Sequence, residues 1–239
     1  MLELKKLTKK YGSFTAVNNL DLTVKKGEIF GFLGPNGAGK TTTINMMCGL
    51  ITITGGDALL GGVSVKNKPI DFKRKTALIP DKPYMFEKLK GIEYIEFNAN
   101  LYGVEKRAFK ERYEKYSQIF GVNEYANDFI ESYSHGMSQK LLITSSLIHM
   151  PQLFVLDEPM VGLDPKSQKV LKAEMKKLAK AGMTIFMSTH SLSDAEELCT
   201  NAGIIYEGKL VETGTISAIK RRNGKKRLEE IFFSLTENK

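Results

Sequence analysis

The most chemically specific stretch of the sequence is GPNGAGKTT, residues 34–42. It fits the pattern G-x-x-x-x-G-K-[ST], which starts at Gly34 and ends at Lys40 and Thr41. Glycines let the backbone curl so that its N–H groups point inward at an anion, while the lysine reaches the β- and γ-phosphates and the threonine hydroxyl binds Mg²⁺. A buried strand before it and a helix after it are the required context. The sequence therefore predicts a Mg²⁺–nucleotide site, with a Gly-rich turn that binds nothing as the alternative.

A pair of acids follows a second apolar run, LFVLDEP, residues 153–159. A Mg²⁺–nucleotide site needs a carboxylate at the end of a neighbouring strand, and this run supplies Asp157 there. We expect Asp157 to hold Mg²⁺ directly or through water. We expect Glu158 to act as general base on the attacking water, or to polarise it. The alternative is that both acids only cap a helix beyond Pro159.

A histidine ends a third apolar run, MTIFMSTH, residues 183–190. A single histidine is more often a structural residue than a catalytic one. A parallel sheet, however, presents ligand-facing residues at the carboxyl ends of its strands. The position of His190 therefore predicts a contact with the γ-phosphate.

A second candidate anion site lies in SYSHGMSQKL, residues 132–141, directly before another apolar run. Ser134 is suited to cap a helix, and Gly136 allows a close approach to the backbone. Helix starts attract anions through free N–H groups and the macrodipole. The chain thus carries two anion-binding patterns almost a hundred residues apart, which a single nucleotide site does not explain.

The elements that position these residues form a mixed pattern. Alternating apolar residues over 20–24 predict an antiparallel strand, and an apolar run at 27–34 predicts a buried one. The stretch 88–150 reads as nearly all helical. Further expected elements are a strand at 76–80, a strand at 152–159 that runs into the acids, a helix at 166–182 stopped by Gly182, a strand at 183–190 and a hairpin at 201–214 that turns at Glu207 and Gly208.

This order predicts an α/β fold of the P-loop NTPase type, with a mainly parallel core sheet, an antiparallel β subdomain and a helical subdomain. We expect residues 1–84 and 151–220 to form the nucleotide-binding core. Residues 85–150 would form the helical subdomain with the second anion pattern, and residues 221–239 a basic C-terminal tail.

Composition narrows the class of protein. The chain has 239 residues, 42% hydrophobic and 26% charged, which is an ordinary globular balance. Its two cysteines lack metal-type spacing and indicate reduced thiols. No secretory h-region and no apolar run of about 18 residues occurs, so any membrane role is expected through a partner. The net charge of +8 and the patch KRRNGKKR (220–227) fit a solvated tail, an anionic membrane surface or, least well, nucleic acid.

Taken in order, five motifs resemble those of the ATP-binding subunit of an ABC transporter. They are GPNGAGKTT (Walker A), YSHGMSQ (signature), LFVLDEP (Walker B), GLDP (D-loop) and STH (switch histidine). The resemblance covers essentially residues 2–220. It implies that ATP and Mg²⁺ are the cofactors, and that the signature of one subunit closes over the ATP held by another. That arrangement accounts for two anion-binding patterns in one chain.

The resemblance also implies roles by matched position. Tyr11 stands where the family stacks an aromatic on adenine, with an ordinary core or surface tyrosine as the alternative. Asp164 of the D-loop would contact the partner, and the helical subdomain would touch the membrane subunit. The implied catalytic residues are Glu158, His190 and Asp81, and the implied metal ligands are Thr41 and Asp157. The implied nucleotide-binding residues are Tyr11, Gly34, Pro35, Asn36, Gly37, Ala38, Gly39, Lys40, Thr41, Thr42, Ser134, Gly136 and Asp164.

The sequence departs from the family pattern in three places. Asp81, in ALIPDKP, replaces the usual glutamine, and a carboxylate only accepts hydrogen bonds where an amide also donates. The signature reads SHGMS where SGGQ is common, so His135 replaces a glycine and Met137 a glutamine. The D-loop has Gly162 where serine is common. Signatures of the SxGM type with an acid at the glutamine position resemble single-cassette subunits of exporter-like systems.

The function that follows is ATP binding and hydrolysis by a dimer that drives transport, with export favoured, through a separate transmembrane permease. The second ATP-binding subunit is either identical or a different chain. We expect no direct nucleic-acid binding, and a cytoplasmic protein held at the membrane face through the permease. The alternative is a soluble ABC-type ATPase acting on nucleic acid or ribosomes. The signature and the acid pair argue against a P-loop kinase, and the lack of a discernible N-K-x-D element argues against a GTPase.

Overall fold

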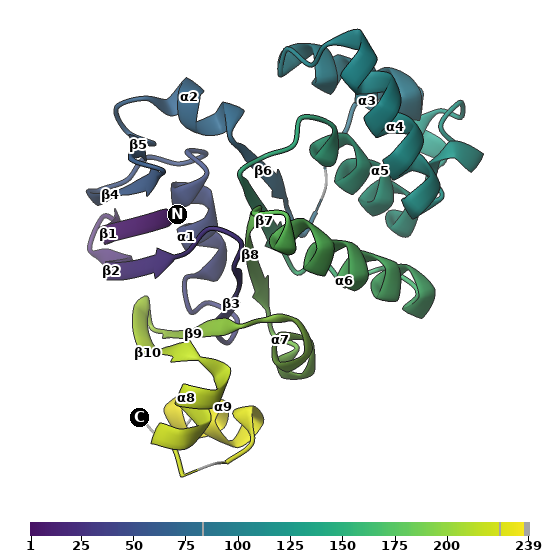
Figure 1. The fold of residues 1–239 in the computed structure, drawn as a ribbon. Helices are drawn as coiled ribbons and strands as arrows, with labels where there is room; N and C mark the ends of the chain where they lie inside the picture. The colour runs from purple at the N-terminus through teal and green to yellow at the C-terminus, as the bar shows by residue number, and fades with distance from the viewer. Residues whose placement is uncertain (83, 225, 237–239) are drawn as a thin grey trace.

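The computed structural model describes residues 1–82, 84–224 and 226–236. Two β-sheets lie side by side at the centre, with a helical region on one side and two C-terminal helices at one end (Figure 1). One sheet is mainly parallel and carries the functional motifs. The other is antiparallel and is formed by strands from the first 64 residues of the chain.

The mainly parallel sheet has six strands. Its inner strands are fully buried and apolar, which is typical of parallel strands covered on both faces. Successive side chains alternate between the faces: Phe30 and Phe186 belong to one apolar core, and Ile29 and Ile185 to the other. From one edge to the other, the strands are β10 (Lys209–Thr215), β9 (Asn201–Tyr206), β3 (Ile29–Leu33), β8 (Thr184–Thr189), β7 (Leu153–Asp157) and β6 (Thr76–Ile79).

All strand pairs in this sheet are parallel except the hairpin of β9 and β10. The loops that follow β3, β6, β7 and β8 therefore leave the same edge, which is where a parallel sheet binds its ligand. The strand and hairpin predictions are confirmed, and the hairpin turns at Glu207 and Gly208 through two residues with positive φ.

The second sheet contains β2 (Phe14–Val24), β1 (Leu2–Tyr11), β4 (Gly55–Leu60) and β5 (Val63–Ser64), in that spatial order. The alternation predicted for residues 20–24 is confirmed, since Leu20, Leu22 and Val24 are buried while the residues between them are exposed. All pairs are antiparallel. The sheet packs its apolar face on α1 (Lys40–Met47), so it buttresses the helix that follows the Gly-rich loop.

The region 85–150 is helical, as predicted. Its last helix starts at the second anion pattern, with Ser134 as the cap. This helix packs against the two preceding α-helices and against β6, which ties the region to the parallel sheet. The helical elements are α3 (Gly91–Leu101), α4 (Lys106–Phe120), α5 (His135–Ile148) and two 3₁₀ turns, Val122–Glu124 and Ile130–Ser132.

The remaining helices cover the sheet and close the chain. The helix expected over 166–182 is observed as α6 (Pro165–Lys180), with Leu171, Met175 and Leu178 buried and Gly182 at φ 97° beyond its end. No helix within the described ranges is long and apolar enough to cross a bilayer. The others are α2 (Pro69–Arg74), α7 (Leu192–Leu198), α8 (Ile216–Arg222) and α9 (Leu228–Thr236).

Helix α9 lies within the stretch for which a basic tail was expected, and it packs against α7, α8 and β9. Leu228 and Ile231 are completely buried in the main apolar core, whereas Phe233 on the opposite face is exposed. The apolar stripe of α9 therefore contributes to the stability of the body of the protein.

We predict that Ile231→Ala lowers the free energy of unfolding by about 2–5 kcal/mol, because it removes a fully buried aliphatic side chain and leaves a cavity. Phe233→Ala is the matched control on the same helix and is expected to cost less than about 1 kcal/mol. Urea unfolding followed by circular dichroism measures both. Equal, small losses would show that α9 does not pack on the body.

Candidate functional site

The Gly-rich loop connects β3 to α1, so its backbone N–H groups surround the start of a helix. Lys40 is buried there, and its Nζ donates hydrogen bonds to the carbonyl oxygens of Gly34 at 2.7 Å and Pro35 at 3.1 Å. Burial lowers the pKa of Lys40 from its ordinary value, and the nearby carboxylates of Glu158 and Asp157 oppose that shift. The loop thus surrounds the ammonium group of Lys40, and the carboxylates of Asp157 and Glu158 lie near that group.

Two glycines of the loop are required by close packing. A Cβ at Gly34 would lie 2.5 Å from the carbonyl oxygen of Ile205, and one at Gly39 would lie 2.7 Å from that of Ala16. Gly39 also has φ 104°, which side-chain-bearing residues rarely adopt. Gly37 has φ 78° but no atom within 4 Å of the Cβ position, so only its backbone conformation favours glycine. The loop is held between β9 and β2.

Asp157 ends β7 and is almost completely buried. The Thr41 hydroxyl, on the first turn of α1, donates to Asp157 Oδ2 at 3.2 Å, and the Ser188 hydroxyl on β8 donates to Oδ1. Asp157 and Ser188 are direct partners across the parallel strands. The predicted pairing of the Gly-rich loop with this carboxylate is therefore seen in the fold, because three separate segments meet at one side chain.

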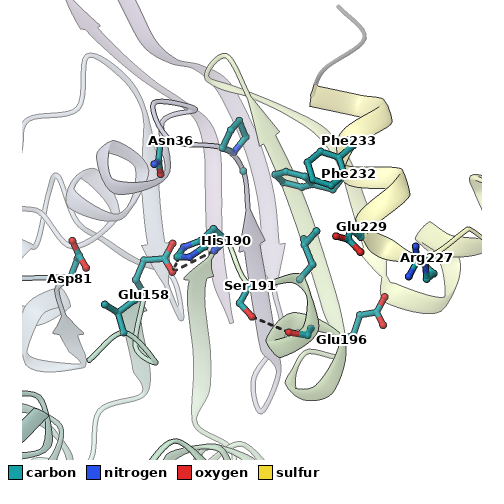
Figure 2. Close-up of a pocket in the computed structure, with 15 residues that line it drawn as sticks. Asn36, Asp81, Glu158, His190, Ser191, Glu196, Arg227, Glu229, Phe232 and Phe233 are labelled. Carbon is teal, nitrogen blue, oxygen red and sulfur yellow. Dashed lines mark hydrogen bonds and ion pairs between the residues drawn. The ribbon is translucent and has the colours of Figure 1, made fainter. Parts of the chain in front are cut away.

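Glu158 follows directly and turns its side chain toward β8. Its φ of 51° lies in the left-handed region, a conformation that costs about 1–3 kcal/mol for a non-glycine residue and is concentrated at functional sites. His190 Nδ1 lies 2.9 Å from Glu158 Oε2, and the backbone N–H of His190 donates to the same oxygen at 3.4 Å (Figure 2). The imidazole thus fixes the direction in which the carboxylate points.

One cavity of about 820 Å³ is lined by the three predicted catalytic residues, Asp81, Glu158 and His190. Asp81, in the loop after β6, faces it from one side, and Glu158 and His190 lie between Asp81 and the C-terminal helix α9 (Figure 2). The part of the Gly-rich loop that reaches this cavity consists of Gly34, Pro35 and Asn36.

The other predicted nucleotide-binding residues do not line this cavity. They are the rest of the Gly-rich loop, Gly37, Ala38, Gly39, Lys40, Thr41 and Thr42, and four residues outside that loop, Tyr11, Ser134, Gly136 and Asp164. Tyr11 is half-exposed at the end of β1, with Lys9 Nζ 4.8 Å from its ring centroid. Ser134 caps α5 and accepts from the N–H of Met137 at 3.3 Å, as its sequence pattern predicts.

Asp164 caps α6. It accepts hydrogen bonds from the Ser167 hydroxyl at 2.6 Å and from the Ser167 N–H at 2.9 Å, and these bonds lower the pKa of Asp164 to about 2. Its carboxylate is therefore ionised at neutral pH and is held at the start of the helix, where the macrodipole also favours it.

Sequence reasoning missed Ser188 and the wall that α9 contributes to the cavity. A single serine inside the apolar run MTIFMSTH was the available signal for Ser188. No local signal marks the cavity-facing residues of α9, because they reach the site only through tertiary packing. These residues include Glu229, Phe232 and Phe233.

A Gly-rich loop between a buried strand and a helix, with a carboxylate at its threonine from β7, which β8 separates from β3 in the sheet, defines a P-loop nucleotide-binding protein. The ABC transporter family model matches residues 17–161 of the chain. The linearmycin resistance ATP-binding protein LnrL of Bacillus subtilis (strain 168) is 35% identical over 224 residues, which are 94% of this chain and 72% of LnrL.

Solved structures agree with that match. The structure of an ATP-binding subunit of an ABC transporter has a TM-score of 0.95 at 30% identity and covers 98% of this chain and 99% of that one. A dimeric bacterial ABC transporter cassette shares the fold, with a TM-score of 0.82 at 22% identity over 90% of this chain and 99% of that one. The chain belongs to the ABC transporter family, as an ATP-binding subunit of its ATPase class. The family and the α/β fold predicted from the sequence are both confirmed.

We predict that Gly39→Ala weakens ATP binding at least about tenfold, because its Cβ would overlap the Ala16 carbonyl and its φ is unfavourable. Gly37→Ala is the matched control in the same loop, since it carries only the conformational strain, and is expected to lose less than about fivefold. Titration with a fluorescent ATP analogue measures both. Equal affinities of the two variants would contradict the packing argument.

Proposed function

We propose that two copies of this subunit, or this chain and a similar one, close around two ATP molecules and hydrolyse them to drive export by a separate membrane permease. One observation carries the proposal. The start of the Gly-rich loop, residues 34–36, lines one cavity with Asp81, Glu158 and His190, and Thr41 of the same loop bonds Asp157, whereas Ser134 and Gly136 do not line that cavity and Ser134 caps α5. A chain whose second anion-binding pattern is separate from its own ATP site can use that pattern on the ATP of another copy.

The residues present fit Mg²⁺. The hydroxyl of Thr41 and the carboxylate of Asp157 are hard oxygen donors 3.2 Å apart, and Mg²⁺ is usually held by one or two protein oxygens together with phosphates and water. Thr41 and Asp157 would hold the ion, which when bound neutralises charge on the phosphates. Ser188 would keep Asp157 oriented through its hydroxyl.

We assign the general base to Glu158. Its carboxylate would accept a proton from the attacking water, and His190 orients it through the 2.9 Å contact to Nδ1. The other ring nitrogen of His190 is then available to the γ-phosphate. Asp81 faces the same cavity and would help to position the water, as an acceptor only.

Closure of the pair supplies the rest of the site. Ser134 and Gly136 of one copy would contact the γ-phosphate held by the loop of the other copy, and Tyr11 would stack on the adenine. A shift from mostly open to mostly closed needs roughly 5.5 kcal/mol of differential binding. Two triphosphates with charge-assisted hydrogen bonds can supply an energy of that order. Hydrolysis would remove this bridge and reopen the pair.

An exposed aromatic cluster on the helical region supports docking to a permease. Phe86 and Phe97 are 60% and 48% exposed, and their rings pack edge to face with centroids 5.8 Å apart. Leu101, one turn beyond Phe97, is also exposed. Exposed apolar groups that adjoin one another are typical of protein interfaces. Asp81 of the cavity is only five residues from Phe86, so movement at the ATP site can reach this surface.

Export is the direction we propose. LnrL is named as a resistance protein, and resistance to a toxic compound fits its removal. This subunit would be held at the cytoplasmic membrane face by the permease, through the exposed cluster of Phe86 and Phe97.

We predict that Glu158→Gln binds ATP, loses nearly all turnover and forms an ATP-dependent dimer in gel filtration with light scattering, because the bridging γ-phosphate persists. Adding Ser134→Ala should prevent that dimer. Ser132→Ala is the matched control, an exposed serine two residues earlier that bonds only the carbonyl of Phe129. Normal hydrolysis by Glu158→Gln would remove Glu158 from the role of base, and a dimer that ignores Ser134→Ala would contradict the shared site.

We also predict that the chain sediments with native membranes and is released by detergent together with a polytopic protein. Phe97→Asp should abolish this association while leaving ATPase activity of the purified chain unchanged, because the cluster lies away from the cavity. Ile70→Asp on α2 is the control, since Ile70 is 67% exposed outside the cluster. Recovery with ribosomes or nucleoid would instead support the rival ATPase.

A further inference from the structure

The signature and the D-loop, which depart from the family pattern at His135 and Gly162, touch each other within the chain. A Cβ at Gly162 would lie 2.0 Å from His135 Cδ2 and 2.7 Å from its Nε2, so the imidazole occupies the space of a side chain at position 162. Real Cβ atoms do not tolerate such distances. The larger residue in the signature is therefore matched by the smaller residue in the D-loop.

A second close approach joins the same two segments. A Cβ at Gly136 would lie 3.0 Å from the carbonyl oxygen of Gly162, so the first turn of α5 lies close against the loop, and a side chain there would require the loop to shift slightly. One turn along α5, Lys140 Nζ lies 3.7 Å from Asp164 Oδ2. The start of α5 thus contacts the loop 160–164 in three ways: through the His135 ring, through the close packing of Gly136 on the Gly162 carbonyl, and through the ion pair of Lys140 with Asp164.

The far side of the loop 160–164 is fixed by a single side chain. Gln168 Nε2, on α6, donates to the carbonyl oxygens of Met160 and Leu163, both at 3.1 Å. These two bonds fix Met160 and Leu163, and the chain between them bends at Gly162, which has φ 77°. The bend itself is contacted by His135.

We infer that His135 and Gly162 are a size-matched pair, in which His135 is a positioning residue that holds the D-loop against the signature turn of the same chain. This inference rests on the proposed function, in which both segments face a second copy. The two segments then approach the second copy as one unit. Either substitution alone breaks the match: alanine at 135 leaves the loop without its contact, and serine at 162 displaces the ring.

The consequence differs between a free chain and a closed pair. His135 is exposed, so in a free chain a displaced ring can turn into solvent at little cost. In the closed pair that solvent-facing surface is the one that meets the second copy. A displaced ring should therefore oppose dimer formation far more than it opposes folding.

A double-mutant cycle in the Glu158→Gln background tests the pair. We expect Gly162→Ser to raise the ATP concentration for half-maximal dimerisation about tenfold and His135→Ala about threefold. In the chain that already carries His135→Ala, Gly162→Ser should cost no more than about twofold, because the ring is gone and only backbone strain remains. If Gly162→Ser costs the same factor with and without His135, the pair is not size-matched and the inference is overturned.

A second measurement does not depend on dimerisation. In the ATP-free chain, His135→Ala should increase amide hydrogen exchange in peptides covering 160–164 but leave peptides covering 184–189 of β8 unchanged, and the melting temperature should stay close to that of the parent. Unchanged exchange over 160–164 would overturn the positioning role. Failure of the Glu158→Gln parent to dimerise would count against the proposed function alone, since the exchange result stands independently.

Discussion

The buried carboxylate of Asp157 is the point on which the site depends. A carboxyl group that is almost completely out of water is costly unless hydrogen-bond partners surround it, and Thr41 and Ser188 supply hydroxyl donors from two other segments. This requirement places the end of β7, the end of β8 and the start of α1 at one position. Once they are fixed, Glu158 follows the end of β7 and His190 follows the end of β8, so the proposed base and its orienting partner are placed by the two strands that carry Asp157 and Ser188.

The Gly-rich loop depends on a complementary constraint, which is space. Its N–H groups can surround a phosphate only if the loop lies close to its neighbours, and the carbonyls of Ile205 and Ala16 leave no room for a Cβ at Gly34 or Gly39. The antiparallel sheet and the hairpin of β9 and β10 therefore do more than cover the core. They provide the backbone surface against which the loop acquires its shape.

Sequence patterns predicted those elements whose structure is determined by residues close together in the sequence. The buried strands, the capped α5 and α6, and the loop with its acids were all readable because period, capping and motif spacing lie within short windows. The strand Leu2–Tyr11 was not predicted, since it carries four lysines and its alternation breaks at Lys6, where φ is 47° and the register shifts. Ser188, the packing of α9 and the contact of His135 with Gly162 were also beyond reach, because each joins segments distant in sequence.

The two departures at His135 and Gly162 show why a motif residue cannot be interpreted singly. Taken alone, a histidine in the signature suggests a weaker contact with ATP, and a glycine in the D-loop suggests a lost hydroxyl. Taken together, they fit one another, because the His135 ring fills the space that a side chain at position 162 would need. A packed contact can keep its geometry while its residues change, provided that their sizes change in opposite directions. The geometry presented to a second copy is therefore a property of the pair, and neither motif alone determines it.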